Sequence, residues 1–415
     1  MYPVNKPLFT IYLATAILTG GNGLLGTLVG MRASAENFPI QTIGLVMSCY
    51  FIGFVIGSFA WSRIITHFGY TRAFAIIATT AATTAILYVL IIDPIAWGGF
   101  RVASGFCAAG WCTILESWLN INTPREYRGA SLSIYISISM LSIAMGQFLI
   151  IIGDINRFES FAIASILFSV SFIPVVMVKF SEPQRIKTPK LDIGILFEKV
   201  PLGIAGALVA GIIGGAFWGM APVFANAVGM RPFDVALFMF VTAIGGGFFQ
   251  IPIGRYSDRF DRRKVLFFVC FFGAIFMLFS FALSKLWLSA LFFFSFFWGG
   301  PVFSVYAISV AHVNDYLDPN EVVGATGGLL LINGIGSGIG PVLAGYLMHR
   351  FGPSSLFLLM SLLLSVLGVY SYYRISRRAP VPSELQAEYI PMLRTSPLAL
   401  EMDPRIPDQD ENSDS

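Results

Sequence analysis

The run Ile95–Leu115, IAWGGFRVASGFCAAGWCTIL, decides the class of fold because it is long and apolar enough to cross a bilayer as a helix. Arg101 is its only permanently charged side chain. A charge inside a membrane span costs about 3 kcal/mol on insertion scales, so it persists where a partner, a water-filled cavity or a ligand compensates it. The run therefore predicts a membrane protein in which Arg101 faces a path or a binding site for a solute.

The composition supports the membrane class. The chain has 415 residues, of which 56% are hydrophobic and only 12% charged, whereas soluble proteins carry about 25% charged residues. We expect no cleavable signal peptide, because the first apolar stretch, from Leu8, is long enough to be a retained first helix. The cysteines lie in apolar runs and predict small buried side chains rather than disulfides: Cys49, Cys107, Cys112 and Cys270.

Outward from Ile95–Leu115, the chain divides into further apolar stretches of similar length. The pair Asp93-Pro94 predicts a tight turn just before this run. Together the stretches predict twelve spans, at about 8–30, 42–62, 73–92, 95–119, 129–152, 159–179, 201–224, 233–254, 264–284, 287–311, 324–347 and 354–374.

The Lys and Arg residues lie unevenly around these spans. With a cytoplasmic N-terminus, twenty of the 26 lie in cytoplasmic segments and five on the other side, and Arg101 lies inside the membrane. The positive-inside rule then predicts that both termini and the central loop are cytoplasmic. We expect an N-terminal six-helix half at 1–179, a cytoplasmic central loop at 180–200, a C-terminal six-helix half at 201–374 and a disordered cytoplasmic tail at 375–415.

The two halves resemble each other at an offset near 195 residues. Arg128–Ser131 (RGAS) opens span 5 and Val323–Thr326 (VGAT) opens span 11. Val29–Arg32 (VGMR) ends span 1 and Val228–Arg231 (VGMR) follows span 7. A parallel six-plus-six repeat predicts a transporter with its binding site between the repeats.

Two motifs resemble those of the major facilitator superfamily. Gly254–Lys264 (GRYSDRFDRRK) is similar to its loop motif G-x-x-x-D-R-x-x-R-R-K between spans 8 and 9, and Arg101–Gly105 (RVASG) to its R-x-x-x-G element in span 4. Glu116–Asn120 (ESWLN), Ala311–Asp315 (AHVND) and Gly334–Pro341 (GIGSGIGP) resemble the YcaD-type branch of bacterial inner-membrane facilitators. The resemblance implies an all-α integral membrane protein with twelve transmembrane helices in two pseudo-symmetric six-helix halves, located in the bacterial inner membrane.

The chain also departs from the family pattern. The loop between spans 2 and 3 carries Trp61 where the motif has an acid. Drug–proton antiporters usually carry Gly-Pro in span 5, where this chain reads Gly146-Gln147. The Gly-Pro pair occurs instead in span 11, as Gly340-Pro341.

Arg101 and Glu116 are the principal candidates in span 4. We expect Arg101 to bind an anion or to couple protons, and the alternative is a structural Arg that bonds carbonyls or snorkels outward. Glu116 lies 15 positions further on, which places it only about 60° from Arg101 around the helix. Because it is nearer the cytoplasmic end, we favour a gate ion pair with Arg125 or Arg128 over a substrate contact.

Asp258 ends span 8, and the family fold implies that it faces the start of span 5 and Arg128. We interpret it as a latch of the outward-open state, with an ordinary interfacial charge as the alternative. The other residues assigned to the gate and the motifs are Gly254, Arg259, Arg262, Arg263 and Asp315.

Several polar or aromatic residues fall within spans, where each has two interpretations: a substrate contact or helix packing. Packing is the favoured interpretation for each taken singly. Asn22 is the best substrate candidate, because span 1 lines the cavity in the family. The others are Gln147, Gln250, Asn333, Trp218 and Trp298.

No nucleotide motif, metal cluster or nucleophile–base arrangement is present in the sequence, so we expect no enzyme activity, no cofactor, no metal and no nucleic-acid partner. The predicted partners are a small-molecule substrate, protons and the lipid bilayer, and the chain is expected to be a monomer. We predict a secondary active transporter that works by alternating access, is proton-coupled and favours an organic anion or a neutral polar solute. The alternatives are a multidrug efflux facilitator, a sensor on a transporter fold and a lipid-handling membrane protein.

Overall fold

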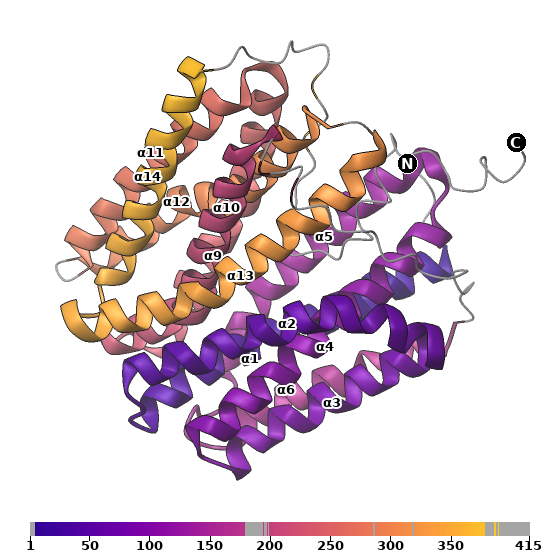
Figure 1. Cartoon of the computed structure of the whole chain (residues 1–415). Helices are drawn as coiled ribbons and strands as arrows, with labels where there is room; N and C mark the ends of the chain where they lie inside the picture. The colour runs from indigo at the N-terminus through magenta and orange to yellow at the C-terminus, as the bar shows by residue number, and fades with distance from the viewer. Residues whose placement is uncertain are drawn as a thin grey trace, which may run out of the picture.

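The structure, a computed structural model, describes residues 5–178, 194, 197, 199–284, 287–317, 319–377, 386 and 389. Its long helices are joined by short turns (Figure 1). The first group comprises α1 (Lys6–Ala35), α2 (Ile40–Phe68), α3 (Tyr70–Leu90), α4 (Pro94–Asn122), η1 (Arg125–Tyr127), α5 (Arg128–Gly146), η2 (Gln147–Ile151), α6 (Glu159–Val170) and α7 (Phe172–Val176). The second comprises α9 (Pro201–Ala227), α10 (Pro232–Arg259), α11 (Arg262–Leu283), α12 (Leu288–Asn314), α13 (Pro319–Phe351) and α14 (Ser355–Arg377).

The helices coincide with the twelve predicted spans to within a few residues, with η2 and α7 completing spans 5 and 6. Eleven segments are long and apolar enough to cross a membrane. The twelfth, α4, has the length of a span but is not apolar enough to be among the eleven. Length and composition together therefore support eleven of the twelve predicted spans. Arg101, Glu116 and several Gly, Ser and Trp residues lower the mean hydropathy of α4 below that of the eleven.

The predicted turn at Asp93-Pro94 is the start of α4. The Asp93 side chain accepts a hydrogen bond of 2.8 Å from the Ala96 backbone N–H and caps the helix. Pro94 occupies the first helical turn, where its missing N–H has no intrahelical partner to lose. The cap fixes where α4 begins and therefore how far along the helix Arg101 lies.

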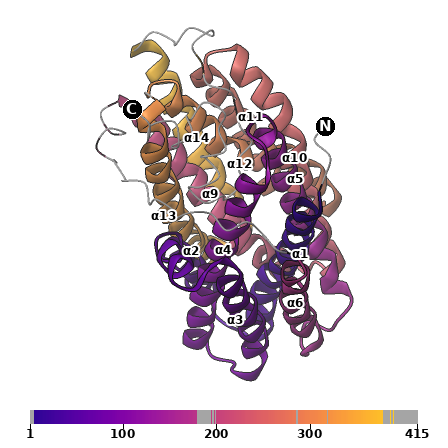
Figure 2. The ribbon, with the colours of Figure 1, turned by 90° about the vertical axis from the view of Figure 1, so that its right-hand side faces the viewer.

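Helices α1 to α7 pack mainly on one another, as do α9 to α14 (Figures 1 and 2). We call these the N-terminal group and the C-terminal group. In the N-terminal group α1 packs on α5 and α2 on α4; in the C-terminal group α9 packs on α13 and α10 on α12. Helices α2 and α13 make the most extensive contact between the two groups.

Each of these crossings is made at glycines whose missing side chain lets backbone meet backbone. In four places of the N-terminal group, a Cβ on a glycine would overlap a carbonyl of the facing helix, and the same happens at four places of the C-terminal group that lie 192 or 194 positions later. This regularity matches the internal repeat that the sequence predicts. The pairs are Gly20–Gly146 and Ile212–Gly340, Gly23–Ile143 and Gly215–Ser337, Tyr50–Gly105 and Thr242–Gly299, and Gly53–Val102 and Gly245–Phe296.

Close contacts between the two groups gather at one end of the bundle, where α1 ends and α2 begins. A Cβ on Gly44 of α2 would lie only 2.5 Å from the Pro341 carbonyl oxygen of α13. The Ser48 hydroxyl donates a hydrogen bond to the Gly338 carbonyl oxygen, again from α2 to α13. We call this the closed end.

The glycine crossings predict that Gly105→Ala destabilises the protein, because the new methyl group would force α2 and α4 apart at the Tyr50 carbonyl. Overpacking of this kind costs about 1–3 kcal/mol in free energy of unfolding. Gly99→Ala is the control on the same helix, since no atom lies within 4 Å of its Cβ position. Thermal unfolding in detergent should show a lower midpoint for Gly105→Ala alone, and equal midpoints for the two variants would contradict the packing argument.

Candidate solute-binding site

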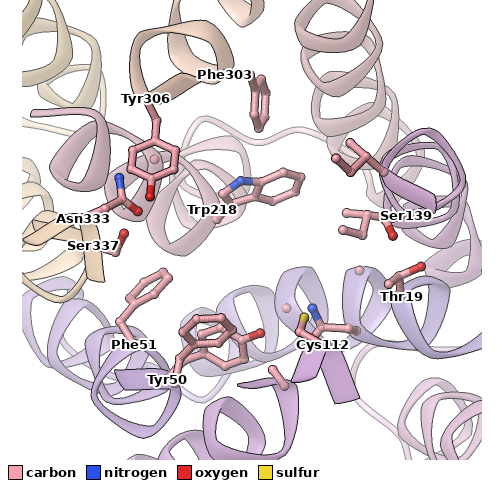
Figure 3. A pocket seen from close by; sticks show the side chains of 18 of the residues that line it. Thr19, Tyr50, Phe51, Cys112, Ser139, Trp218, Phe303, Tyr306, Asn333 and Ser337 are labelled. Atoms are coloured by element: carbon pink, nitrogen blue, oxygen red, sulfur yellow. The ribbon is translucent and has the colours of Figure 1, made fainter. Parts of the chain in front are cut away.

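A cavity of about 170 Å³ lies between the N-terminal and C-terminal groups. This volume would hold on the order of ten water molecules, hence a small organic solute. Its lining residues come from α1, α2, α4 and α5 on one side and from α9, α12 and α13 on the other. Figure 3 shows the side chains of both groups meeting around it. Four of the predicted substrate residues line it: Arg101, Asn22, Trp218 and Asn333.

Arg101 brings the permanent charge into this cavity. Just after Arg101, α2 and α4 pack closely where Gly53 meets Val102 and Gly105 meets Tyr50, and the guanidinium carbon lies 4.8 Å from the centroid of the Tyr50 ring. A guanidinium over an aromatic face gains about 0.5–2 kcal/mol, less than it loses on leaving water. Only 5% of the Arg101 side chain is exposed, and it lines the cavity, so it does not snorkel toward lipid.

No carboxylate among the described residues lies within 4 Å of the Arg101 nitrogens. The buried Nε of Arg101 also lacks a hydrogen-bond partner within the described part of the chain. The cavity therefore holds a positive charge whose described neighbours are the Tyr50 ring and the Tyr88 hydroxyl, and neither of these is a carboxylate. An anionic group of a solute would compensate this charge.

The polar residues of the spans divide into cavity-lining and packing residues. Asn333 does both, since its Nδ2 donates a hydrogen bond of 3.1 Å to the Ala207 carbonyl while the residue lines the cavity. Gln147 is 1% exposed and does not line the cavity: it accepts a hydrogen bond from Thr27 of α1 and donates one to the Ile143 carbonyl four residues earlier in its own segment. Gln250 likewise donates a hydrogen bond of 3.0 Å to the Phe303 carbonyl. Trp298 is fully buried among Phe217, Phe238 and Phe357, which is a packing position.

Glu116 lies on α4, is completely buried and does not line the cavity. Its neighbours include Cys112 and Tyr135, both of which line the cavity. A carboxyl group in this position is one side chain away from the solute site. The predicted ion pair with Arg125 or Arg128 stays a prediction.

The loop motif builds a buried charge cluster at the end of the bundle opposite the closed end. Arg262 is 1% exposed, and its Nε donates a hydrogen bond of 2.7 Å to Oδ2 of Asp315, which is 2% exposed. The Arg262 Nη1 reaches Ser257 Oγ at 2.8 Å and Asp258 Oδ1 at 3.4 Å. The motif thus links the end of α12 to the α10–α11 turn.

Asp261 caps the start of α11 and pairs with a second arginine of the motif. Arg263 Nη2 lies 2.7 Å from Asp261 Oδ2, and Asp261 accepts a further bond from the Arg263 backbone N–H. Burial alone raises the pKa of Asp261, but its hydrogen bonds to Arg263 outweigh burial and leave that pKa below its ordinary value. Arg259 is exposed. We expect Asp261 to remain ionised at neutral pH.

Asp258 has an additional partner that the sequence did not indicate. Its Oδ1 accepts a hydrogen bond of 2.8 Å from the Tyr389 backbone N–H, and a Cβ on Gly254 would overlap the Tyr389 ring. The Tyr389 ring packs into the α10 surface that Gly254 leaves open, and the predicted disorder of the tail at 375–415 stays a prediction. The predicted contact of Asp258 with Arg128 stays a prediction.

Sequence reasoning missed most of the aromatic residues of the cavity wall. Tyr50, Trp111, Tyr135, Phe303 and Tyr306 all line it, and none carries a motif. Phe, Tyr and Trp make up 15% of the chain, so an aromatic residue in a span is no signal by itself. The glycines of the α2–α4 crossing were the usable signal for Tyr50, since they fix which residue faces Arg101.

Comparison with known proteins agrees with this arrangement. The family model described as Major Facilitator Superfamily matches residues 11–205 and 203–401. The chain belongs to the Major Facilitator Superfamily. It is therefore a multi-pass membrane protein of a transporter family, and the predicted resemblance is confirmed.

Curated relatives of this superfamily cover most of the chain. An uncharacterized MFS-type transporter of Yersinia pestis is 26% identical over 367 residues, which are 87% of this chain and 94% of the relative. The MFS-type transporter YcaD of Escherichia fergusonii is 26% identical over 363 residues, which are 86% of this chain and 93% of the relative. The chain is thus similar to the YcaD-type branch over nearly its whole helical part.

Solved structures share the fold. The nucleoside transporter NupG superposes with a TM-score of 0.74 at 15% identity, over 89% of this chain and 99% of that chain. A D-xylose-proton symporter gives a TM-score of 0.68 at 13% identity, over 92% and 99% of the two chains. At these identities the likeness extends to the fold of the superfamily.

The buried Arg262–Asp315 pair predicts that Asp315→Asn is strongly destabilising, because it leaves a guanidinium at 1% exposure without its closest carboxylate. Breaking a buried pair costs about 3–5 kcal/mol, and we expect the lower end since Ser257 and Asp258 remain. Asp234→Asn is the control, because its partner Arg231 is 80% exposed and such pairs contribute about 0–1 kcal/mol. Denaturant unfolding in detergent should separate the two variants, and equal losses would contradict the assignment.

Proposed function

We propose that this facilitator is a secondary active transporter that carries a small organic anion by alternating access. The observation that carries the proposal is the charge of Arg101 in the cavity, with an aromatic face below it and no described carboxylate within 4 Å. At an effective dielectric constant of 20, a carboxylate about 4 Å from Arg101 gains about 4 kcal/mol, and a cation there loses a similar amount. This difference is large enough to select the sign of the charge that the cavity admits. A neutral polar solute is admitted less favourably, through Asn22 and Asn333.

In this proposal the N-terminal and C-terminal groups are two pseudo-symmetric six-helix halves that rock about the cavity. The glycine crossings at offsets of 192 and 194 residues support the pseudo-symmetry. The clustering of contacts at the closed end supports a conformation sealed on that side. The transporter would work as a monomer in the bacterial inner membrane.

The charge distribution orients the molecule in the proposal. With both termini cytoplasmic, twenty Lys and Arg residues lie on the cytoplasmic side and five on the other. The closed end, where α1 ends and α2 begins, is then periplasmic, and the conformation described above is inward-facing.

Proton coupling is assigned to Glu116. A fully buried carboxyl group beside Cys112 and Tyr135 is close enough to the cavity for its protonation to respond to a bound anion. A carboxylate solute that carries its own proton across is the second route. A multidrug facilitator is the competing candidate, and the aromatic lining of the cavity is the observation that favours it.

We expect Arg101→Ala to abolish anion transport and Arg101→Lys to retain part of it, because Lys keeps the charge but loses the planar two-point contact. A thermal-shift screen of a metabolite panel identifies ligands, and uptake into proteoliposomes then compares the variants. Arg350→Ala is the control, since it removes one positive charge at the exposed end of α13. Wild-type transport by Arg101→Ala, or transport of lipophilic cations, would overturn the proposal.

The orientation predicts the compartment of reporters fused to the chain. A fusion at Ser383 should report the cytoplasm, and an insertion in the loop at 36–39 should report the periplasm. Alkaline phosphatase and a fluorescent protein, active on opposite sides, measure this directly. Phosphatase activity at Ser383 would reverse the orientation.

A further inference from the structure

The cavity wall is built mainly from rings on both sides of the proposed substrate path. Aromatic side chains account for eight of its 24 lining residues, which is far above the 15% aromatic content of the chain. They are distributed over both groups of helices, so a bound solute would meet rings from two directions. These residues are Tyr50, Phe51, Phe54, Trp111 and Tyr135 from the N-terminal group and Trp218, Phe303 and Tyr306 from the C-terminal group.

Trp218 differs from the other seven. Each of those is less than 10% exposed, whereas the Trp218 ring is half-buried and projects into the cavity between the two groups (Figure 3). Phe217 and Phe303 hold it edge-on, with ring centroids 5.1 and 5.8 Å away. No hydrogen bond of its indole N–H is present among the described residues. A face and a polar edge of the indole are therefore available to a ligand.

Trp218 and Arg101 lie at similar depth on facing groups. Arg101 is seven residues from the start of α4 and Trp218 nine from the end of α9, which is about 10 and 14 Å at 1.5 Å per residue. Both of those helix ends lie at the closed end of the bundle. A solute held by Arg101 thus has Trp218 across the cavity from it.

The Arg101 guanidinium is held in place by the side chains beside it. The guanidinium carbon lies over the Tyr50 ring and the Tyr88 hydroxyl lies beside the same group, while Phe51 packs edge-on against Tyr50 with centroids 5.4 Å apart. With one face covered, a ligand approaches the guanidinium through its N–H edge, the geometry that a carboxylate matches with two hydrogen bonds. The remaining body of the ligand then extends into the aromatic part of the cavity.

From this arrangement we infer that the substrate is an aromatic carboxylate, whose carboxylate binds Arg101 and whose ring packs against Trp218. This inference rests on the proposed function and narrows it from organic anions to one class. Asn22, Asn333 and Ser337 supply hydrogen-bonding groups for a polar ring substituent. Indole-, phenyl- and hydroxyphenyl-substituted short carboxylates fit this description.

Four probes of matched size test the inference by equilibrium binding to the purified full chain in detergent. Phenylacetate has the ring and the charge, cyclohexylacetate the charge without the aromatic ring, phenylacetamide the ring without the charge, and 2-phenylethylamine the ring with a positive charge. We expect phenylacetate to bind about five- to tenfold more tightly than cyclohexylacetate, the scale of one aromatic pair beyond simple burial. Phenylacetate should bind more tightly than phenylacetamide and 2-phenylethylamine by a factor larger than this.

Two variants separate the contribution of the aromatic contact from that of the charge to phenylacetate binding. Trp218→Leu should bring phenylacetate and cyclohexylacetate to equal affinity while both still bind better than phenylacetamide. Trp287→Leu is the control, because Trp287 is 64% exposed at the start of α12 and outside the cavity. It should leave the preference for phenylacetate unchanged.

The outcomes separate this inference from the broader proposal. Equal or tighter binding of cyclohexylacetate to the unaltered chain overturns the aromatic class and leaves transport of an organic anion in place. An aromatic preference that survives Trp218→Leu overturns the assignment to Trp218. Tightest binding of 2-phenylethylamine overturns both the inference and the proposed function, and failure of all four probes to bind overturns the inference.

Discussion

The close approach of helix backbones at glycines is the constraint on which the rest of this structure depends. Lipid tails are as apolar as the helices, so helices in a bilayer associate through close packing and not through hydrophobic burial. At four helix crossings, eight contacts place a glycine directly against a facing carbonyl, and those of the C-terminal group lie 192 or 194 positions after those of the N-terminal group. Weak Cα–H···O contacts become possible at such distances and add to the packing. Two of the eight contacts lie at the crossing of α2 and α4, which sets Arg101 over Tyr50.

Equivalent positions of the repeat carry different side chains in the two groups of helices. Arg101 corresponds, at an offset of 194, to Ser295, which bonds its own helix at the Phe292 carbonyl. Gln147 corresponds to Pro341: the first meets Thr27 through a hydrogen bond, and the second packs on Gly219 at the equivalent place. The Gln in the Gly146-Gln147 pair is therefore a polar version of a contact that the C-terminal group makes with proline. Only one side of the cavity carries a permanent charge among the described lining residues.

The sequence predicts the helices well because bilayer thickness constrains each of them independently of its neighbours. The bounds of α1 to α14 follow from apolar length, from caps such as Asp93 and from prolines at helix starts. The cavity is only partly predictable. Arg101 stands out because its charge is costly, whereas Trp218 and Tyr306 resemble every other aromatic residue in an apolar span until packing selects a face. Tyr389 was not predicted at all, because its position depends on the space that Gly254 leaves in a distant helix.

The central claim is that the Arg101 guanidinium is the group that holds the anionic end of the substrate. A structure of the unaltered protein determined with phenylacetate at saturating concentration tests it most directly. The account predicts density for the carboxylate with both oxygens about 3 Å from Arg101 nitrogens. Density for the ligand elsewhere in the cavity, with Arg101 bonded instead to helix carbonyls or to an acidic side chain, would contradict the account.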